Sequence, residues 1–168
     1  MGYLDAIRDQ TARALWEAEN VLSCIPGALW EKEYCGIPLY KHVYHMLHSL
    51  DRWLINPERY EEPAFHTENL NNLDVPTAQA LSRAEMEAYF AQVREKITAY
   101  LDALSEDELT QTPEGSAWTR FTLILAQHRH LHTHMGMLMG FIIAETGLWP
   151  RVLGLTGTPR ERSGPEYM

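Results

Sequence analysis

Apolar residues recur at helical spacing in four stretches of the chain, and residues that break helices separate these stretches. The first stretch covers residues 3–24 and stops before Pro26. The second covers residues 38–56, with a proline in its first turn and Pro57 directly after its end. Proline fits the first turn of a helix but interrupts a helix interior, so both stretches are predicted to be helices.

The third and fourth stretches carry their own signals for helix ends. Residues 82–104 open with Ser82 and Glu85, the two ends of a capping box in which each side chain satisfies a backbone N–H of the other residue. Residues 118–146 are followed by Gly147, which suits the left-handed position after a helix. No stretch combines strict alternation with β-branched residues, so no strand is predicted.

Four helices of this length favour an all-α protein built as a four-helix bundle. The connection between the second and third helices, residues 57–81, is long for a compact domain and is expected to be a functional segment or a crossover. Residues 149–168 show no periodicity and are expected to be an irregular C-terminal tail that packs on the body or on a neighbour, or that frays. The whole chain, residues 1–168, is expected to be a single domain.

Charge narrows the classes of partner. The chain has 14 Lys and Arg against 23 Asp and Glu, a net charge of −9, whereas binding to phosphate backbones needs positive charge, so no nucleic acid partner is expected. The most apolar segment, residues 121–144, contains Gln127, Arg129 and four histidines, so no membrane association is expected. The first residues do not follow the signal-peptide pattern, which predicts a cytoplasmic protein, and the two cysteines are expected to be reduced.

Histidine is the unusual feature of the composition, because seven of the eight histidines fall within residues 42–48 and 128–134. Those in the second segment form two i, i+4 pairs on nearly opposite sides of the helix: His130 with His134, and His128 with His132. An i, i+4 pair can reach a single metal ion. Periodicity does not choose between the pairs, and the residues alone leave three readings open: a metal site, buried hydrogen-bonded histidines, and a proton relay or pH sensor.

The histidines of the second helix lie on different faces. His45 falls among polar positions, which favours a solvated side chain. His48 shares a line with Tyr44 and Asp51 that is apolar at its ends and polar at its centre. This pattern is expected where another helix packs over a small polar site.

Two motifs resemble those of a known family. Residues 130–138, which begin with His130 and include His134, resemble the HxxxHxGxL signature on the last helix of the DinB superfamily, the YfiT-like metalloenzymes. Residues 48–51 resemble the HxxD element of that family's second helix. Order, spacing and chain length agree, so the resemblance covers most of the chain. It implies a DinB-like bundle whose metal ligands are His48, His130 and His134, with His45 as the alternative first ligand.

The implied ligand set points to a catalytic type of site. Three imidazoles leave a coordination position open for water or substrate, and Zn²⁺ or Ni²⁺ suits nitrogen ligands. Such an ion lowers the pKa of a bound water or thiol toward neutrality. Polar neighbours are expected to orient the ligand rings, the candidates being Tyr44, Asp51 and Gln127.

The resemblance also implies a class of reaction. Characterised members of the superfamily include transferases that use low-molecular-weight thiols, so a metal-dependent thiol S-transferase or hydrolase acting on a small molecule is expected. The alternative is a metal-containing binding or structural module without turnover. Relatives that are dimers favour a homodimer.

Overall fold

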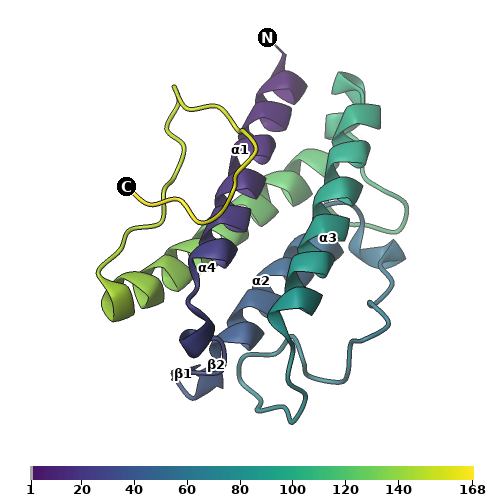
Figure 1. Cartoon of the computed structure of the whole chain (residues 1–168). Helices are drawn as coiled ribbons and strands as arrows, with labels where there is room; N and C mark the ends of the chain where they lie inside the picture. The colour runs from purple at the N-terminus through teal and green to yellow at the C-terminus, as the bar shows by residue number, and fades with distance from the viewer. Residues whose placement is uncertain (1) are drawn as a thin grey trace.

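The computed structural model describes residues 2–168 and contains four long helices (Figure 1). These are α1 (Tyr3–Cys24), α2 (Leu39–Trp53), α3 (Arg83–Ala103) and α4 (Arg120–Thr146). Three short 3₁₀ helices lie in the links: Gly27–Leu29, Pro57–Arg59 and Glu106–Thr110. The four predicted helices are therefore confirmed, with bounds close to those expected, and the protein is an all-α bundle.

The predicted helix-end signals are present in the structure. The Ser82 hydroxyl accepts a hydrogen bond from the Glu85 backbone N–H at 3.2 Å, and the Glu85 carboxylate accepts one from the Ser82 N–H at 2.8 Å. Gly147 follows α4 with φ of 71°, and its N–H donates to the Ile143 carbonyl at 2.8 Å. A side chain at this left-handed position would be strained, so glycine ends the helix at low cost.

The prediction that the chain has no strand is wrong in the link between α1 and α2. There β1 (Glu33–Tyr34) pairs antiparallel with β2 (Ile37–Pro38). Cys35 and Gly36 join them with φ of 56° and 76°, the positive values that a tight hairpin turn requires. Strands of two residues are too short to produce a visible alternation, which is why periodicity missed them.

Each long helix packs mainly against two others. α1 contacts α3 and α4, and α2 contacts the same two helices, so α1 and α2 stand diagonally across the bundle although they are consecutive in the chain. In Figure 1, α2 and α3 run in the same general direction, and the connection between them returns along the outside of the bundle. The long connection is therefore a crossover, one of the two expected outcomes.

The core lies between the four helices and continues into the α2–α3 connection. Leu47 and Val43 of α2 are fully buried, as are Ile124 and Leu138 of α4. The connection itself contributes Leu70, whose side chain has no exposed surface. The buried Leu70 side chain holds the middle of the connection against the bundle, close to the polar side chains of α2 described below.

The C-terminal tail packs along α1 (Figure 1). The Asn20 side chain of α1 donates to the Glu166 carbonyl at 2.8 Å and accepts from the Glu166 N–H at 2.9 Å. The Trp16 indole N–H donates to the Arg160 carbonyl at 2.7 Å. Of the outcomes expected for the tail, the structure therefore shows packing on the body of the bundle.

The long helix α4 is the most apolar of the four helices. Within residues 2–168, no helix is both long enough and apolar enough to cross a bilayer. Both cysteines are free thiols, with Cys24 buried and Cys35 exposed in the hairpin turn.

Candidate metal centre

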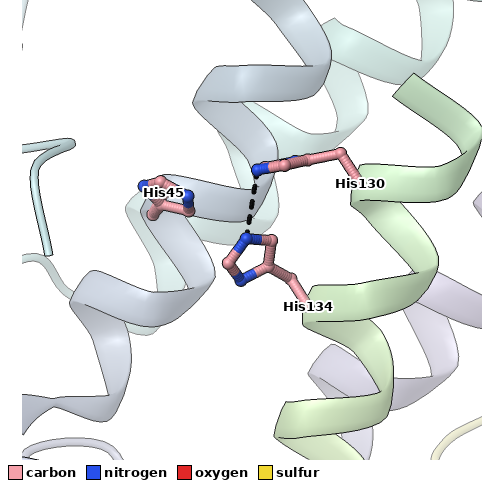
Figure 2. A group of neighbouring side chains, drawn as sticks. All are labelled: His45, His130 and His134. Atoms are coloured by element: carbon pink, nitrogen blue, oxygen red, sulfur yellow. Dashed lines mark hydrogen bonds between the residues drawn. The ribbon is translucent and has the colours of Figure 1, made fainter. Parts of the chain in front are cut away.

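Three histidines from two helices meet where α2 packs against α4. His130 and His134 extend from successive turns of α4 toward α2, which carries His45 (Figure 2). One potential ligand atom of each lies within 4.8 Å of the other two. Nε2 of His130 is 3.1 Å from Nε2 of His134. Nitrogen ligands of a tetrahedral zinc ion, with bonds of about 2.0–2.1 Å, stand about 3.3 Å apart. The pair on α4 therefore already has the spacing that a metal ion requires.

The α2–α3 connection fixes the ring of His45. Its Nδ1–H donates to the Asn71 backbone carbonyl at 2.6 Å. That carbonyl is held in place by its neighbours, because Leu70 is fully buried and Asn69 makes a turn with φ of 64°. A neutral imidazole with its proton on Nδ1 carries a lone pair on Nε2, which is the arrangement found in metal-binding histidines.

Electrostatics keep the two histidines of α4 uncharged. Burial lowers the pKa of His130 and lowers that of His134 to about 4, and the neighbouring His45 shifts the pKa of both in the same direction. Both imidazoles are therefore neutral near pH 7. Neutral rings are the form that binds a cation, because a protonated ring has no lone pair to give.

The hydrogen bonds of His130 and His134 also fit a metal ion. Within residues 2–168, each ring has its single hydrogen bond to the other ring, and Nδ1 of both is buried without a partner. Buried polar atoms normally have hydrogen-bond partners. Each of these two rings therefore has one nitrogen whose hydrogen-bonding capacity is unused. An ion at the facing nitrogens would bind both rings, and an all-nitrogen set suits Zn²⁺ or Ni²⁺.

His48, the expected first ligand, does not join this group, and His45 takes its place. The two residues are three positions apart on α2, so their side chains point in directions that differ by about 60°. His48 is 2% exposed, and its Nε2 lies 2.7 Å from a carboxylate oxygen of Glu62 in the connection. The expectation that His45 is solvated is also wrong, because α4 and the connection cover this polar face and leave His45 half-buried.

The three residues expected to orient the ligand rings bind elsewhere. Within the described residues, none of them hydrogen-bonds to the three histidines of the centre. Their partners are His66 for Tyr44 (2.6 Å), Tyr89 and Lys96 for Asp51 (2.9 and 2.6 Å), and Ser49 for Gln127 (3.3 Å). Tyr44 therefore ties α2 to the connection, Asp51 ties α2 to α3, and Gln127 ties α4 to α2.

The group that orients the ring of His45 is the Asn71 backbone carbonyl, which was not among the expected residues. A backbone carbonyl is present in every residue, so residue type gives no sign of its role. The unusual length of residues 57–81 was the one available signal.

In the second pair of histidines on α4, His128 faces α1. Nε2 of His128 is 2.8 Å from the Thr11 hydroxyl, and burial lowers the pKa of His128. His132 is exposed, and its Nδ1–H donates to the His128 carbonyl one turn earlier. Within the described residues, neither belongs to a group of three potential ligands. This pair has the contacts of ordinary hydrogen-bonded histidines.

Comparison with known proteins agrees with this architecture. Neither a search of curated proteins nor a search of solved structures gave a significant match. The family model of the DinB superfamily matches residues 8–138, a region that contains α2, α3, the connection and all three histidines of the centre. The match covers more than three quarters of the sequence and ends before the tail. The chain therefore belongs to the DinB superfamily.

Proposed function

We propose that this protein is a metal-dependent enzyme acting on a small molecule, with the ion held by His45, His130 and His134. The observation that carries the proposal is the convergence of three imidazoles that are each only half-buried. Three protein ligands are typical of catalytic zinc sites, whereas structural sites usually have four. Partial exposure leaves a route by which a substrate can approach.

The residues around the centre would position the ion rigidly. α4 presents His130 and His134 from adjacent turns, and the Asn71 carbonyl holds the ring of His45. Ligands supported in this way lose little freedom when they bind an ion. A bound Zn²⁺ or Ni²⁺ would supply Lewis acidity, which makes a water or a thiol a better nucleophile near neutral pH.

A low-molecular-weight thiol is the cosubstrate that we propose, with thiol S-transfer or hydrolysis as the reaction class. Membership of the DinB superfamily supports this choice. The protein's own thiols are poorly placed to replace the cosubstrate. Burial raises the pKa of Cys24 beneath the tail, and Cys35 lies in the hairpin turn; neither is part of the histidine group.

Metal analysis of the purified protein after exposure to Zn²⁺ or Ni²⁺ tests the centre. We expect His45→Ala, His130→Ala and His134→Ala each to hold one equivalent less than the wild type. His132→Ala is the matched control, because it lies on the same helix but is exposed, and it should lose none. Equal metal content in wild type and in all three variants would refute the assignment.

Cobalt substitution tests the thiol. Adding cysteine or glutathione to the Co²⁺ protein should produce a thiolate-to-cobalt charge-transfer band in the near ultraviolet, and His134→Ala should abolish it. Conjugation of the thiol to an electrophile should depend on the same residues. Stoichiometric metal with neither the band nor any metal-dependent turnover would favour the alternative, a metal-binding module without catalysis.

We also propose a homodimer, in which the outer face of α4 meets its copy. The dimers known in the superfamily support a dimeric state. On that face, exposed small and apolar residues lie within about 100° of one another around the helix, with the exposed Arg129 and Thr133 between them: Leu125, Gly136, Gly140 and Ala144.

A further inference from the structure

A second group of potential metal ligands lies where α2 meets the α2–α3 connection, one helical turn beyond His45. Its members are His48, Glu62 and His66, and one ligand atom of each lies within 4.8 Å of the others. We propose that this group is a second divalent-metal site, separate from the three-histidine centre. The proposal stands on its own residues and does not require the first centre to be catalytic.

The carboxylate of Glu62 is already oriented for this role. Its Oε2 lies 2.7 Å from Nε2 of His48 and 3.6 Å from Nδ1 of His66. Its other oxygen, Oε1, is 3.5 Å from the Arg52 guanidinium. One carboxylate oxygen therefore faces both imidazole rings, while the Arg52 side chain holds the other oxygen. Two imidazoles and one carboxylate form a ligand set that zinc enzymes use.

Burial differs among the three ligands in a way that suits an accessible site. The side chains of His48 and His66 are 3% and 14% exposed, whereas that of Glu62 is 39% exposed. The two rings stack with their centroids 5.2 Å apart, which fixes their relative position. An ion would therefore enter past Glu62 and meet two imidazoles that are already in place.

Protons occupy the positions that an ion would take. The Nε2–H of His48 donates to Glu62, so ion binding must displace this proton. Nδ1 of His66 is 2.6 Å from the Tyr44 hydroxyl, in a hydrogen bond that engages the same nitrogen. Tyr44 therefore competes with the ion for His66. Removing its hydroxyl should strengthen metal binding, whereas a purely structural network would only be weakened.

Zinc titration of the full-length protein separates the two sites. We expect two equivalents in the wild type and one in His134→Ala, where only the second site remains. Combining His134→Ala with Glu62→Gln or with His66→Ala should remove the last equivalent. Glu62→Gln keeps the size of the side chain and an oxygen that can accept from His48, so it tests the charge with little effect on folding. Tyr44→Phe in the His134→Ala background should bind Zn²⁺ several-fold more tightly.

The outcomes distinguish this proposal from that for the first centre. If His134→Ala binds no Zn²⁺, or if its single equivalent survives both Glu62→Gln and His66→Ala, the second group is a hydrogen-bond network and not a metal site. If instead His134→Ala loses nothing relative to wild type, the first assignment fails while the second can still hold. Circular dichroism of each variant shows whether the fold is intact. If His66→Ala unfolds the protein, the Zn²⁺ content of the variant with Glu62→Gln tests the second site by itself.

Discussion

Three histidines on α2, spaced at three-residue intervals, have three different hydrogen-bond acceptors. His42 donates from Nε2 to the Tyr34 carbonyl at 3.1 Å, His45 donates to the Asn71 carbonyl, and His48 donates to Glu62. Each acceptor comes from outside α2. The same residue type on one helix is therefore a buried structural side chain at position 42, a member of the three-histidine group at position 45 and a member of the second group at position 48.

His42 predicts how the stability of the metal-free protein depends on pH. Burial lowers the pKa of His42 below its ordinary value of 6.5, and the nearby His45 and Lys41 add to this shift, although the Tyr34 carbonyl opposes it. His134 on α4 lies close enough for His42 to lower its pKa in turn. Nδ1 of His42 is buried without a hydrogen-bond partner in the described chain, and the backbone groups of Tyr34 and Ile37 offset only part of the cost of burying a charge there.

The unfolded chain therefore takes up this proton first as the pH falls below about 6.5. We expect the free energy of unfolding of chelator-treated protein to decrease from pH 7 to pH 5. Each unit of difference in pKa between the folded and unfolded states contributes about 1.4 kcal/mol at the acid end. His42→Gln keeps a donor for Tyr34 but does not titrate, so urea unfolding should show a shallower pH dependence. Identical slopes for the two proteins would contradict the argument.

At the scale of the element, α2 is covered on its polar side as well as on its apolar side. Lys41 has no exposed surface, and its ammonium group donates to the Val75 carbonyl of the connection. Asp51 is 8% exposed and accepts hydrogen bonds from two residues of α3. A helix that is covered on both sides can carry buried charged residues only where neighbouring elements supply partners.

Substitution of Asp51 tests whether this buried carboxylate stabilises the fold or contributes to metal affinity. Asp51→Ala would leave the buried Tyr89 hydroxyl without this acceptor, whereas Lys96 can turn to solvent because its side chain is 46% exposed. We expect a loss of about 1–3 kcal/mol in the free energy of unfolding, with Asp51→Asn losing less. Affinity at the three-histidine centre should not change. A fall of about 10- to 100-fold in metal affinity would instead support the expected role of Asp51 in orienting a ligand ring.

At the scale of the whole molecule, the order of the helices explains where both groups of ligands lie. Because α2 and α3 run in the same general direction, the chain must return along the bundle between them (Figure 1). The returning segment passes over α2 and brings Glu62, His66 and the Asn71 carbonyl to it. A direct hairpin between the two helices would supply none of these groups.

The proposed dimer makes a prediction at this scale. Gly140 has open space around the position of a Cβ, so Gly140→Arg fits the isolated subunit but would place a charge in the proposed interface. Light scattering should give twice the chain mass for the wild type and the chain mass for the variant. Ala91→Arg, on an exposed position of α3, is the control and should stay dimeric. A monomeric wild type would reject the dimer.

Local patterns in the sequence determined the helices and the pairing of histidines within α4. The bounds of α3 and α4 follow from Ser82 and Gly147, because capping depends on residues a few positions apart. The pairing of His130 with His134 follows from the pitch of the helix. Each of these features depends on contacts within about one turn, and such contacts can be derived from spacing alone.

Tertiary structure decided which residues complete each group. His45 and His48 both lie on α2 within reach of partners, and only the packing of α4 on one side and of the crossover on the other separates their roles. His66 and the Asn71 carbonyl come from a segment without periodicity, where sequence spacing gives no direction in space. Contacts between distant segments depend on how the elements pack, so only the fold of the bundle shows that His45, and not His48, lies beside His130 and His134.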